Sequence, residues 1–459
     1  MSKKIRFAHW KSNCRLVRSL QGKTDLDILV HPEDRRGFIK CLEELGYKKI
    51  QSPAWSSYPD VEDWLAMDKE TAVFLHLHVH FSMVTGLKHV KHLYLPWTIL
   101  FFKYIKTDEL TGWPVPVPEL EIIVLFIRIY AKMDFFQKSR PNPSIPSFLK
   151  EEIQWLWDSS ETHKISSLCK ELGLKVPGGL SSVLTHMADR PNDADILEIS
   201  RAFYHQVRKF HRMNGTVAGI ISAYYKFYLR VSTRSMAVFG PFQLRKRLPA
   251  GGKVIAFIGS DGSGKSSLAN DVIKWLSYKI DCHYLYMGKN PHVKSGGKLL
   301  KPWDNFIYGE HPIAKKIRQL IGDFFFILRI RRKNALLRKA RKLAKKGSVV
   351  ICDRFPQIHV PELNDGVMLN QCKSRKLKRL EKMHFYKAIK NKADIFFRLV
   401  VHPETAHKRK PEHSMEMIQK KCEAFSNITF PNSEVIDIDA NKPYDEVLSE
   451  IQQRIWKNL

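Results

Sequence analysis

The chain has 459 residues, of which 44% are hydrophobic and 27% charged, a composition that supports a folded core and excludes a disordered or collagen-like protein. Its 76 lysines and arginines outnumber 46 acidic residues, and the net charge of +30 favours nucleotides, nucleic acid or anionic lipid headgroups as partners. The seven cysteines are scattered along the chain, which predicts a reduced protein. No apolar run is long enough to span a membrane, and the start lacks the apolar core of a signal peptide, so we expect the protein to be cytoplasmic.

Changes in residue pattern predict four segments along the chain. Residues 1–115 read as an α+β domain, and residues 116–235 show helical spacing of apolar residues. Glycine, proline and basic residues in 236–252 are typical of an exposed linker. Apolar strands alternate with helices over 253–459, which predicts an α/β fold with a doubly wound parallel sheet covered on both faces.

Two carboxylates stand close together in the first segment. Asp25 and Asp27 lie two residues apart on a predicted strand, so they share one face of it. Such a pair can hold two metal ions for phosphoryl or nucleotidyl transfer. With predicted helices at 12–20 and 33–45 on either side, the arrangement resembles the nucleotidyltransferase fold of the DNA polymerase β superfamily, which implies that both aspartates bind metal.

A later strand of the same segment carries histidines. Over 71–81, the side chains of His76, His78 and His80 share one face, where that superfamily has a third carboxylate. The three histidines fit a transition-metal site, polar packing or a phosphate-binding face equally well. Whether this domain transfers nucleotides therefore stays open, and the helical region 116–235 corresponds to the superfamily's trailing helices.

The strongest motif is a glycine-rich loop in the last segment. Residues 259–266 fit G-x-x-x-x-G-K-[ST], and they follow a predicted strand at 254–258 and open a helix over 266–280. Loop amides and the helix N-terminus attract phosphate oxygens. Lys265 is expected to reach the β- and γ-phosphates and Ser266 to bind Mg²⁺, although a strand-to-helix turn without a ligand has the same appearance.

Two further motifs follow strands of the same predicted sheet. Asp353 and Arg354 directly follow the strand 349–352, at a place where a carboxylate faces the ligand crevice and an arginine can clamp a phosphate. The alternative is an ion pair at the strand end. After the strand 395–401, the basic residues of 407–413 suit a lid that closes over a phosphoryl group, and the alternative is a solvated basic loop.

The order of these three motifs resembles a thymidylate kinase. That family has a phosphate loop with an internal Asp-Gly, an Asp-Arg-Tyr/Phe motif and a V-x-P-E-x-A-x-x-R lid motif, which match 259–267, 353–355 and 401–409. The resemblance is greatest to divergent members from bacterial surface-polysaccharide gene clusters. It implies ATP-dependent phosphoryl transfer, with ATP and Mg²⁺ as cofactors, to a nucleoside monophosphate such as dTMP or to a related phosphorylated acceptor.

The same resemblance assigns a role to each motif residue. Four residues are implied as catalytic, namely Lys265, Asp353, Arg354 and Arg409, and Lys410 lines the lid. The implied nucleotide-binding residues are Gly259, Asp261, Gly262, Ser263, Gly264, Lys265, Ser266 and Ser267. The stretch 356–366 differs from the acceptor-binding stretch of dedicated dTMP kinases, which leaves the acceptor open.

One predicted helix carries much of the excess positive charge. Ten of the eighteen residues in 329–346 are lysine or arginine, and none is acidic. The pattern fits a solvated helix that packs on the sheet. It also fits a helix whose arginines line the acceptor phosphate pocket, or one that contacts nucleic acid or an anionic membrane. Two alternative functions follow, a nucleotide-switched nucleic-acid-binding protein and a glycan-assembly protein at a membrane surface.

Overall fold

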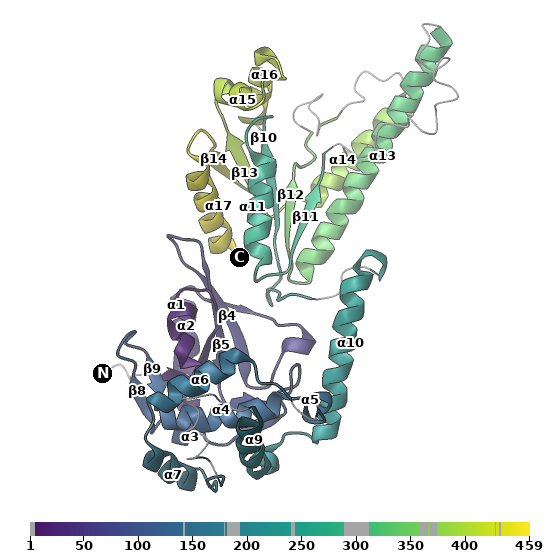
Figure 1. Ribbon diagram of the computed structural model, residues 1–459. Coiled ribbons are helices and arrows are strands. Elements are labelled where there is room, and N and C mark those ends of the chain that lie inside the picture. The colour runs from purple at the N-terminus through teal and green to yellow at the C-terminus, as the bar shows by residue number, and fades with distance from the viewer. Residues whose placement is uncertain are drawn as a thin grey trace. The chain divides into compact units, whose positions relative to one another are not determined.

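The chain forms two compact units, Met1–Lys246 and Arg247–Leu459, in the computed structural model (Figure 1). The finer boundaries that the sequence predicts at 115, 235 and 252 stay predictions, and 240–243 of the predicted linker lie outside the described residues. For 233–239 and 312–326 only the backbone is described. The structure describes residues 5–140, 143–178, 180, 193–239, 244–288, 312–358, 366–367, 374–426, 428–430 and 433–459.

The first unit is built on a mixed five-stranded sheet with the strand order β1-β2-β5-β4-β3. Its strands are β1 (Phe7–His9), β2 (Leu26–Val30), β3 (Lys48–Ile50), β4 (Val61–Met67) and β5 (Phe74–His80). The central pair β2 and β5 is parallel, and the other pairs are antiparallel. The register sets His78 opposite Asp27 on one neighbouring strand and opposite Asp63 on the other. Strand pairing therefore gathers polar residues that are far apart in the sequence.

Short helices flank this sheet where the sequence predicts them. They are η1 (Asn13–Arg15), α1 (Leu16–Leu20), η2 (Pro32–Asp34) and α2 (Arg35–Glu44). Each predicted helix thus begins with a 3₁₀ turn. Phe38 and Leu42 of α2 are buried against the sheet, because they lie four residues apart on one helix face.

The rest of the first unit is mainly helical, as predicted. Its core helix α4 (Pro118–Lys132) is buried on almost every side, which explains why its sequence is apolar on most faces. Phe126 of α4 stacks on Phe203 with ring centroids 6.2 Å apart. The other helices are α3 (Thr98–Phe101), α5 (Phe135–Lys138), α6 (Ser147–Asp158), α7 (Thr162–Glu171), α9 (Asp193–Val207) and α10 (Gly215–Phe239).

The short remaining elements of this unit are two-stranded sheets and single turns. They are β6 (Met83–Thr85) with β7 (Leu93–Leu95), β8 (Ile105–Thr107) with β9 (Pro114–Pro116), η3 (Ala54–Ser56) and η4 (Arg208–Phe210). Across the described residues of the whole chain, no helix combines the length and apolar character that crossing a membrane requires.

The second unit contains a five-stranded parallel sheet with the order β11-β12-β10-β13-β14, which confirms the predicted α/β class. Its strands are β10 (Val254–Gly259), β11 (Cys282–Tyr286), β12 (Val349–Asp353), β13 (Ile395–Val400) and β14 (Glu434–Asp439). The central strand β10 is completely buried, as its apolar run predicts. Because all five strands are parallel, the loops after their carboxyl ends lie along one edge of the sheet.

Helices cover both faces of the second sheet (Figure 1). On one face, Leu337 and Ala340 of α13 (Pro312–Lys345) and Phe385 of α14 (Arg375–Lys390) share a core with Val254 and Ala256. The other helices are α11 (Lys265–Ser277), α15 (Pro403–Arg409), α16 (Met415–Ser426) and α17 (Tyr444–Asn458).

The predicted basic helix forms the second half of α13. Leu337, Ala340 and Leu343 of this half are buried, whereas Arg331, Arg338 and Lys342 are exposed to solvent. This arrangement matches the first interpretation of the pattern, a solvated helix that packs on the sheet through one apolar face.

Candidate functional sites

The loop between β10 and α11 forms the first candidate site. The strand ends at Gly259 and the helix begins at Lys265. Within the loop, Gly262 and Gly264 have φ angles of +81° and +86°, a left-handed conformation that glycine adopts without a Cβ clash. A Cβ on Gly262 would also lie 2.4 Å from the carbonyl oxygen of Ala406 in α15. Glycine at 262 is therefore required both by the turn and by the close approach of α15.

A pocket of about 440 Å³ opens over this loop. Besides the loop and the first turn of α11, its wall includes Arg354 after β12, Arg409 and Lys410 at the end of α15, and Lys442 before α17. Backbone N–H groups at a helix N-terminus have no intrahelical acceptor and carry a partial positive charge. Four cationic side chains thus join a helix N-terminus around one volume, a combination that suits a polyanionic ligand.

The structure brings most of the predicted nucleotide-site residues to this pocket. Those that line it are Asp261, Gly262, Ser263, Gly264, Lys265, Ser266, Ser267, Arg354, Arg409 and Lys410. Gly259 and Asp353 lie at the ends of the adjacent strands and are absent from the pocket wall.

Asp261 is the anionic centre of the site. Its carboxylate lies 2.6 Å from the Lys421 ammonium of α16, 3.4 Å from the Arg354 guanidinium and 3.9 Å from the Lys265 ammonium. Burial alone would raise the pKa of Asp261, but the contact with Lys421 and the charge of Lys265 hold it below its usual value. Lys265 also donates a hydrogen bond to the backbone oxygen of Ser260 at 2.7 Å. The cations that would meet a phosphate are thus held by a carboxylate and a carbonyl oxygen.

Lys421 was missed at the sequence level. It lies on α16, beyond the predicted lid motif, and nothing in its local sequence distinguishes it from Lys420, the other lysine of that helix. Its role depends on how α16 packs near the loop, which only the structure shows.

Asp353 ends β12 as a fully buried carboxylate. Its Oδ2 accepts a hydrogen bond from the Tyr284 hydroxyl at 2.8 Å, whereas Oδ1 has no hydrogen-bond partner among the described residues. A buried carboxylate oxygen without a partner is costly, so a ligand at this position would be stabilising. Ser266 is exposed at the start of α11. A carboxylate and a hydroxyl are oxygen ligands of the kind Mg²⁺ prefers, so the chemistry of each side chain suits that ion.

Backbone strain marks the next residue. Arg354 has a φ angle of +73°, which is rare for a residue with a side chain, and its N–H donates to the carbonyl oxygen of Phe257 at 3.1 Å. Strained backbone of this kind concentrates at functional sites, where surrounding contacts hold it in place. The strained residue thus lies next to Asp353, whose Oδ1 has no hydrogen-bond partner in the part of the chain that the structure describes.

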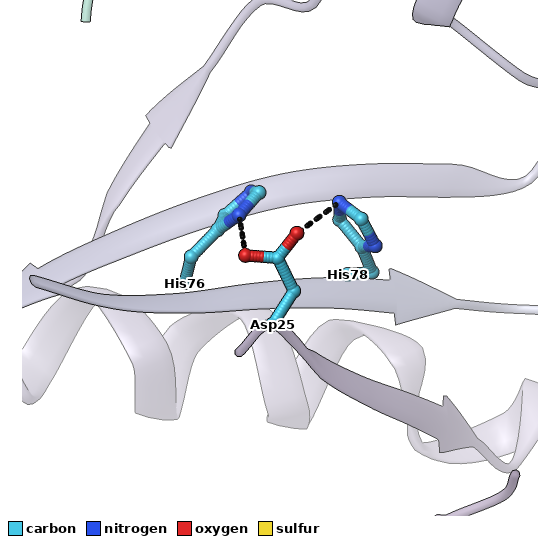
Figure 2. Close-up of side chains that lie close together, drawn as sticks. All are labelled: Asp25, His76 and His78. Atoms are coloured by element: carbon cyan, nitrogen blue, oxygen red, sulfur yellow. Dashed lines mark hydrogen bonds and ion pairs between the residues drawn. The ribbon is translucent and has the colours of Figure 1, made fainter. Parts of the chain in front are cut away.

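The second candidate site is a cluster of aspartates and histidines on the sheet of the first unit (Figure 2). Asp25 precedes β2, and its Oδ1 lies 2.7 Å from Nδ1 of His76. Its Oδ2 lies 3.7 Å from Nε2 of His78. One ligand atom from each of these three residues lies within 4.8 Å of the other two. The predicted metal residue Asp25 therefore meets two histidines of the predicted face.

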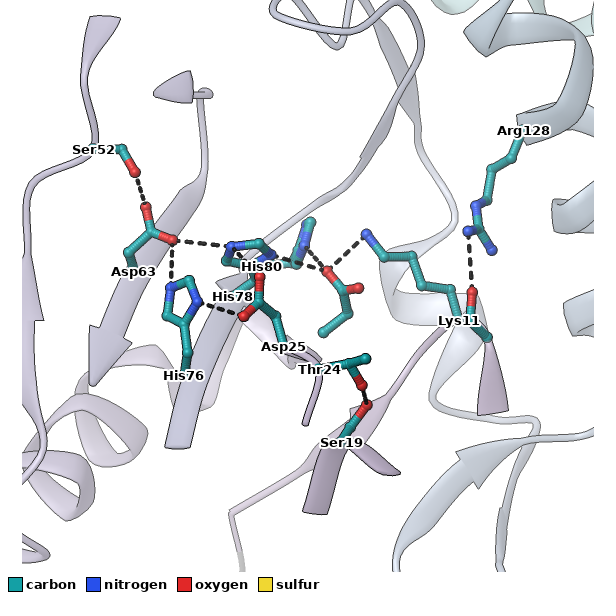
Figure 3. Close-up of polar contacts among 12 residues, drawn as sticks. Lys11, Ser19, Thr24, Asp25, Ser52, Asp63, His76, His78, His80 and Arg128 are labelled. Carbon is teal, nitrogen blue, oxygen red and sulfur yellow. Dashed lines mark hydrogen bonds and ion pairs between the residues drawn. The ribbon is translucent and has the colours of Figure 1, made fainter. Parts of the chain in front are cut away.

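A third carboxylate belongs to this cluster, although the sequence expectation found no acid on the histidine strand. Asp63 comes from the neighbouring strand β4, and its Oδ1 lies 3.0 Å from Nε2 of His76 and 3.2 Å from Nε2 of His78 (Figure 3). The Ser52 hydroxyl donates a hydrogen bond to the same carboxylate, and the Lys246 ammonium lies 2.6 Å from Oδ1. Burial alone would raise the pKa of Asp63, but hydrogen bonds from both histidines hold it far below its usual value.

Asp27 has different partners from Asp25. Its Oδ1 lies 2.8 Å from the Lys11 ammonium, 3.2 Å from Nε2 of His80 and 3.5 Å from Nδ1 of His78. Burial works against its ionisation, but Lys11 and the two histidines hold the pKa of Asp27 well below its usual value. The charge of Asp27 is therefore already matched by a lysine, and the two acids of the Asp-x-Asp motif are not equivalent.

Cations crowd the side of the cluster near Asp27. Burial lowers the pKa of Lys11 to about 8, and burial together with repulsion from Lys11 lowers the pKa of Lys91 to about 7. Arg128 is buried as well, donating to the Ser12 hydroxyl at 3.3 Å (Figure 3). The negative charge of Asp27 opposes this lowering for both lysines, so the carboxylate already compensates part of the positive charge on this side of the cluster.

Comparison with known proteins shows sequence similarity over less than half of the chain. No protein-family model matches the chain. It is 27% identical over 219 residues to the uncharacterized ATP-binding protein YghR of Escherichia coli K12, an alignment that covers 44% of this chain and 86% of that protein. The uncharacterized ATP-binding protein YghS of the same strain is 25% identical over 216 residues, covering 43% of this chain and 89% of that protein. Part of the chain is thus similar to two ATP-binding proteins.

Proposed function

We propose that the second unit binds ATP with Mg²⁺ and transfers the γ-phosphoryl group to a phosphorylated acceptor, as a thymidylate kinase-like enzyme. One observation carries this proposal. The glycine loop, the N-terminus of α11 and three cationic side chains from separate elements, Lys265, Arg354 and Arg409, meet at one pocket. Transfer of a phosphoryl group depends on positioning and charge stabilisation, which such a pocket supplies.

The donor side of the proposed reaction uses the loop and α11. Backbone amides around Gly262 and Gly264 bind phosphate oxygens, and the Lys265 ammonium exchanges the carbonyl oxygen of Ser260 for an oxygen of the β- or γ-phosphate. Ser266 and Asp353 would hold Mg²⁺, which when bound neutralises charge on the phosphates. The ion would give a partner to Oδ1 of Asp353, which has no hydrogen-bond partner among the described residues.

The acceptor side uses the cations that face the loop from other elements. Arg354 leaves its contact with Asp261 and pairs with an acceptor phosphate, for which a planar guanidinium is suited. Arg409 and Lys410 close over the transferring group from the end of α15. The close contact between Ala406 and Gly262 ties that movement to the loop.

The similarity to YghR and YghS, both described as ATP-binding proteins, supports the nucleotide half of this proposal. The acceptor is named only by class. The stretch that the resemblance places next to the acceptor is 356–366, and 359–365 of it lie outside the described residues. The requirement for a phosphate on the acceptor comes from Arg354 and the basic lid.

A phosphoryl-transfer screen tests the proposal. Full-length protein is incubated with ATP labelled on the γ-phosphate, Mg²⁺ and panels of nucleoside monophosphates and sugar phosphates. We expect one class of acceptor to become labelled, and we expect Arg354→Ala to lose labelling while it still binds ATP. Tight ATP binding with no labelled acceptor and no acceptor-stimulated release of ADP would overturn the kinase assignment and favour a nucleotide-dependent switch.

A further inference from the structure

We propose that the first unit binds a divalent transition-metal ion, such as Zn²⁺, through Asp25, His76 and His78. The ligand atoms are a carboxylate oxygen of Asp25, Nδ1 of His76 and Nε2 of His78, which Figure 2 shows converging. This site differs from the sequence expectation, in which Asp25 and Asp27 together hold metal ions through oxygen atoms. It is independent of the function proposed for the second unit.

The donor set selects the class of metal. Two imidazole nitrogens and one carboxylate suit Zn²⁺, Fe²⁺ and related ions, whereas Mg²⁺ prefers oxygen ligands and retained waters. The carboxylate of Asp27, which a magnesium pair would need, is already 2.8 Å from the Lys11 ammonium. Nitrogen atoms of His76 and His78 therefore take the place of Asp27 in the proposed ligand set.

The outer contacts of both histidines fit metal binding. Nε2 of His76 faces Asp63 at 3.0 Å, and Nδ1 of His78 faces Asp27 at 3.5 Å. In each ring, the nitrogen opposite the proposed ligand atom thus meets a carboxylate. Such a carboxylate accepts the remaining N–H, fixes the tautomer and makes the other nitrogen a better ligand. Asp27 and Asp63 therefore act as positioning residues in this proposal.

Lys246 explains why the ion binds beside Asp25 and not beside Asp63. Its ammonium lies 2.6 Å from Oδ1 of Asp63 and 2.7 Å from Nε2 of His76, so that side of the histidine already has a cation. The opposite side of the His76 ring faces Asp25 at 2.7 Å. A second cation beside Asp63 would be repelled by this ammonium, so we expect the ion on the Asp25 side of the ring.

The position is both rigid and accessible. His76 and His78 project from one face of β5, a central strand of the sheet, so their spacing is fixed by the backbone. The side chain of His76 is 2% exposed, whereas those of Asp25 and His78 are 33% and 27% exposed. Three protein ligands with one open side leave coordination positions for a ligand with oxygen or nitrogen donors.

Metal titration of the full-length protein, free of any polyhistidine tag and of nucleotide, tests the site. We expect calorimetry to show one Zn²⁺ bound per chain and Co²⁺ to give a visible absorption band typical of nitrogen and oxygen ligands. Asp25→Asn and His78→Gln should each weaken Zn²⁺ binding at least about 100-fold, and Asp27→Asn about 10- to 100-fold. A large excess of Mg²⁺ should leave the Co²⁺ spectrum unchanged.

A control histidine variant shows whether the loss of Zn²⁺ binding is specific to the site, and a folding measurement shows whether the ligand variants remain folded. His163→Gln removes a histidine of the same unit whose side chain is 76% exposed and pairs with Glu161, outside the proposed ligand set, so its Zn²⁺ affinity should match the wild type. Thermal unfolding shows whether Asp25→Asn and His78→Gln remain folded. The proposal is overturned if folded wild-type protein binds neither Zn²⁺ nor Co²⁺, if both ligand variants bind Zn²⁺ like the wild type, or if Mg²⁺ displaces Co²⁺.

Discussion

The two candidate sites differ in how the chain builds them. In the second unit, the site is centred on one continuous loop, Gly259–Lys265, whose residues from Asp261 onward line the pocket. In the first unit, the Asp/His cluster is made by side chains from separate segments, brought together by the pairing of β5 with β2 and β4. The first kind of site is visible in the sequence, and the second depends on strand register.

The difference also concerns charge. Around the loop, a single carboxylate, Asp261, holds Lys421, Arg354 and Lys265 close to the place where phosphates are expected. In the cluster, three carboxylates surround two histidines, so a cation is the ligand that the local charges favour. The two units therefore present ligand sites of opposite sign within a chain of net charge +30.

The largest expected effect comes from removing the loop lysine. Lys265→Ala should lower ATP turnover at least about 100-fold, because the ammonium stabilises charge on the transferring phosphoryl group. Steady-state release of ADP measures this loss. Lys274→Ala on the same helix, with a side chain 77% exposed and paired with Asp271, is the matched control and should keep wild-type turnover. Equal turnover of all three proteins would refute the loop as the nucleotide site.

Two glycine variants separate backbone strain from lid contact. Gly262→Ala and Gly264→Ala each force a side chain into a left-handed conformation, at a cost of about 1–2 kcal/mol. Only Gly262→Ala also places its Cβ 2.4 Å from the Ala406 oxygen, since the nearest atom to a Cβ at 264 is 3.9 Å away. We expect a greater loss of stability for Gly262→Ala in urea unfolding. Equal losses would show that α15 does not rest on the loop.

Asp281, which belongs to neither candidate site, shows the effect of a buried carboxylate on stability alone. Asp281, buried before β11, accepts hydrogen bonds from Arg247 and Ser348, each at 2.8 Å. Burial opposes its ionisation, but bonds from His283, Arg247 and Ser348 lower its pKa from 3.8 to about 2. Because the folded pKa is below the unfolded one, the stabilisation is complete above about pH 4 and is lost toward pH 2.

The corresponding prediction concerns stability and not activity. Asp281→Asn should reduce the free energy of unfolding by ~2 kcal/mol at pH 7, and the gap should close as the pH falls from about 4 to 2. Urea unfolding at several pH values measures this. ATP affinity at pH 7 should stay within about twofold of the wild type. A pH-independent gap would contradict the ionised state assigned to Asp281.

The smallest effect is expected on the exposed face of α13. Replacing Arg331, Arg338 and Lys342 by serine should change phosphoryl transfer less than about twofold, because these side chains are exposed and substitutions there rarely matter. Transfer assays of this triple variant, with salt-dependent retention on DNA and flotation with anionic vesicles, distinguish the interpretations of the basic helix. Loss of transfer would place these cations in the acceptor pocket.

Much of the second unit was predictable because its buried strands are apolar runs. The predicted strands at 254–258, 349–352, 395–401 and 435–438 each match an observed strand to within one residue at either end. The edge strand β11 was missed, since its sequence Cys-His-Tyr-Leu-Tyr lacks such a run and is only partly buried. The apolar content of a strand decided both outcomes, since β14 was predicted from Val435, Ile436 and Ile438 although only Ile438 among them is buried.

The two candidate sites also differ in how much of each could be predicted from the sequence. The glycine loop is recognisable because its chemistry lies in consecutive residues, whereas Asp63 and Lys421 take part only through packing of distant elements. Asp63 faces His78 because β4 and β5 pair in one particular register, and a shift of one residue would turn its side chain to the other face. Sequence periodicity predicts strands but does not give that register.

Hydrogen exchange of the full-length protein with a non-hydrolysable ATP analogue and Mg²⁺ tests the central claim most directly. If the loop amides bind phosphate oxygens, peptides covering 259–268 should exchange more slowly when the analogue is present, while peptides covering β5 at 74–80 should be unchanged. Unaltered exchange over 259–268 at saturating analogue, or protection confined to 74–80, would contradict the assignment of the nucleotide site to the second unit.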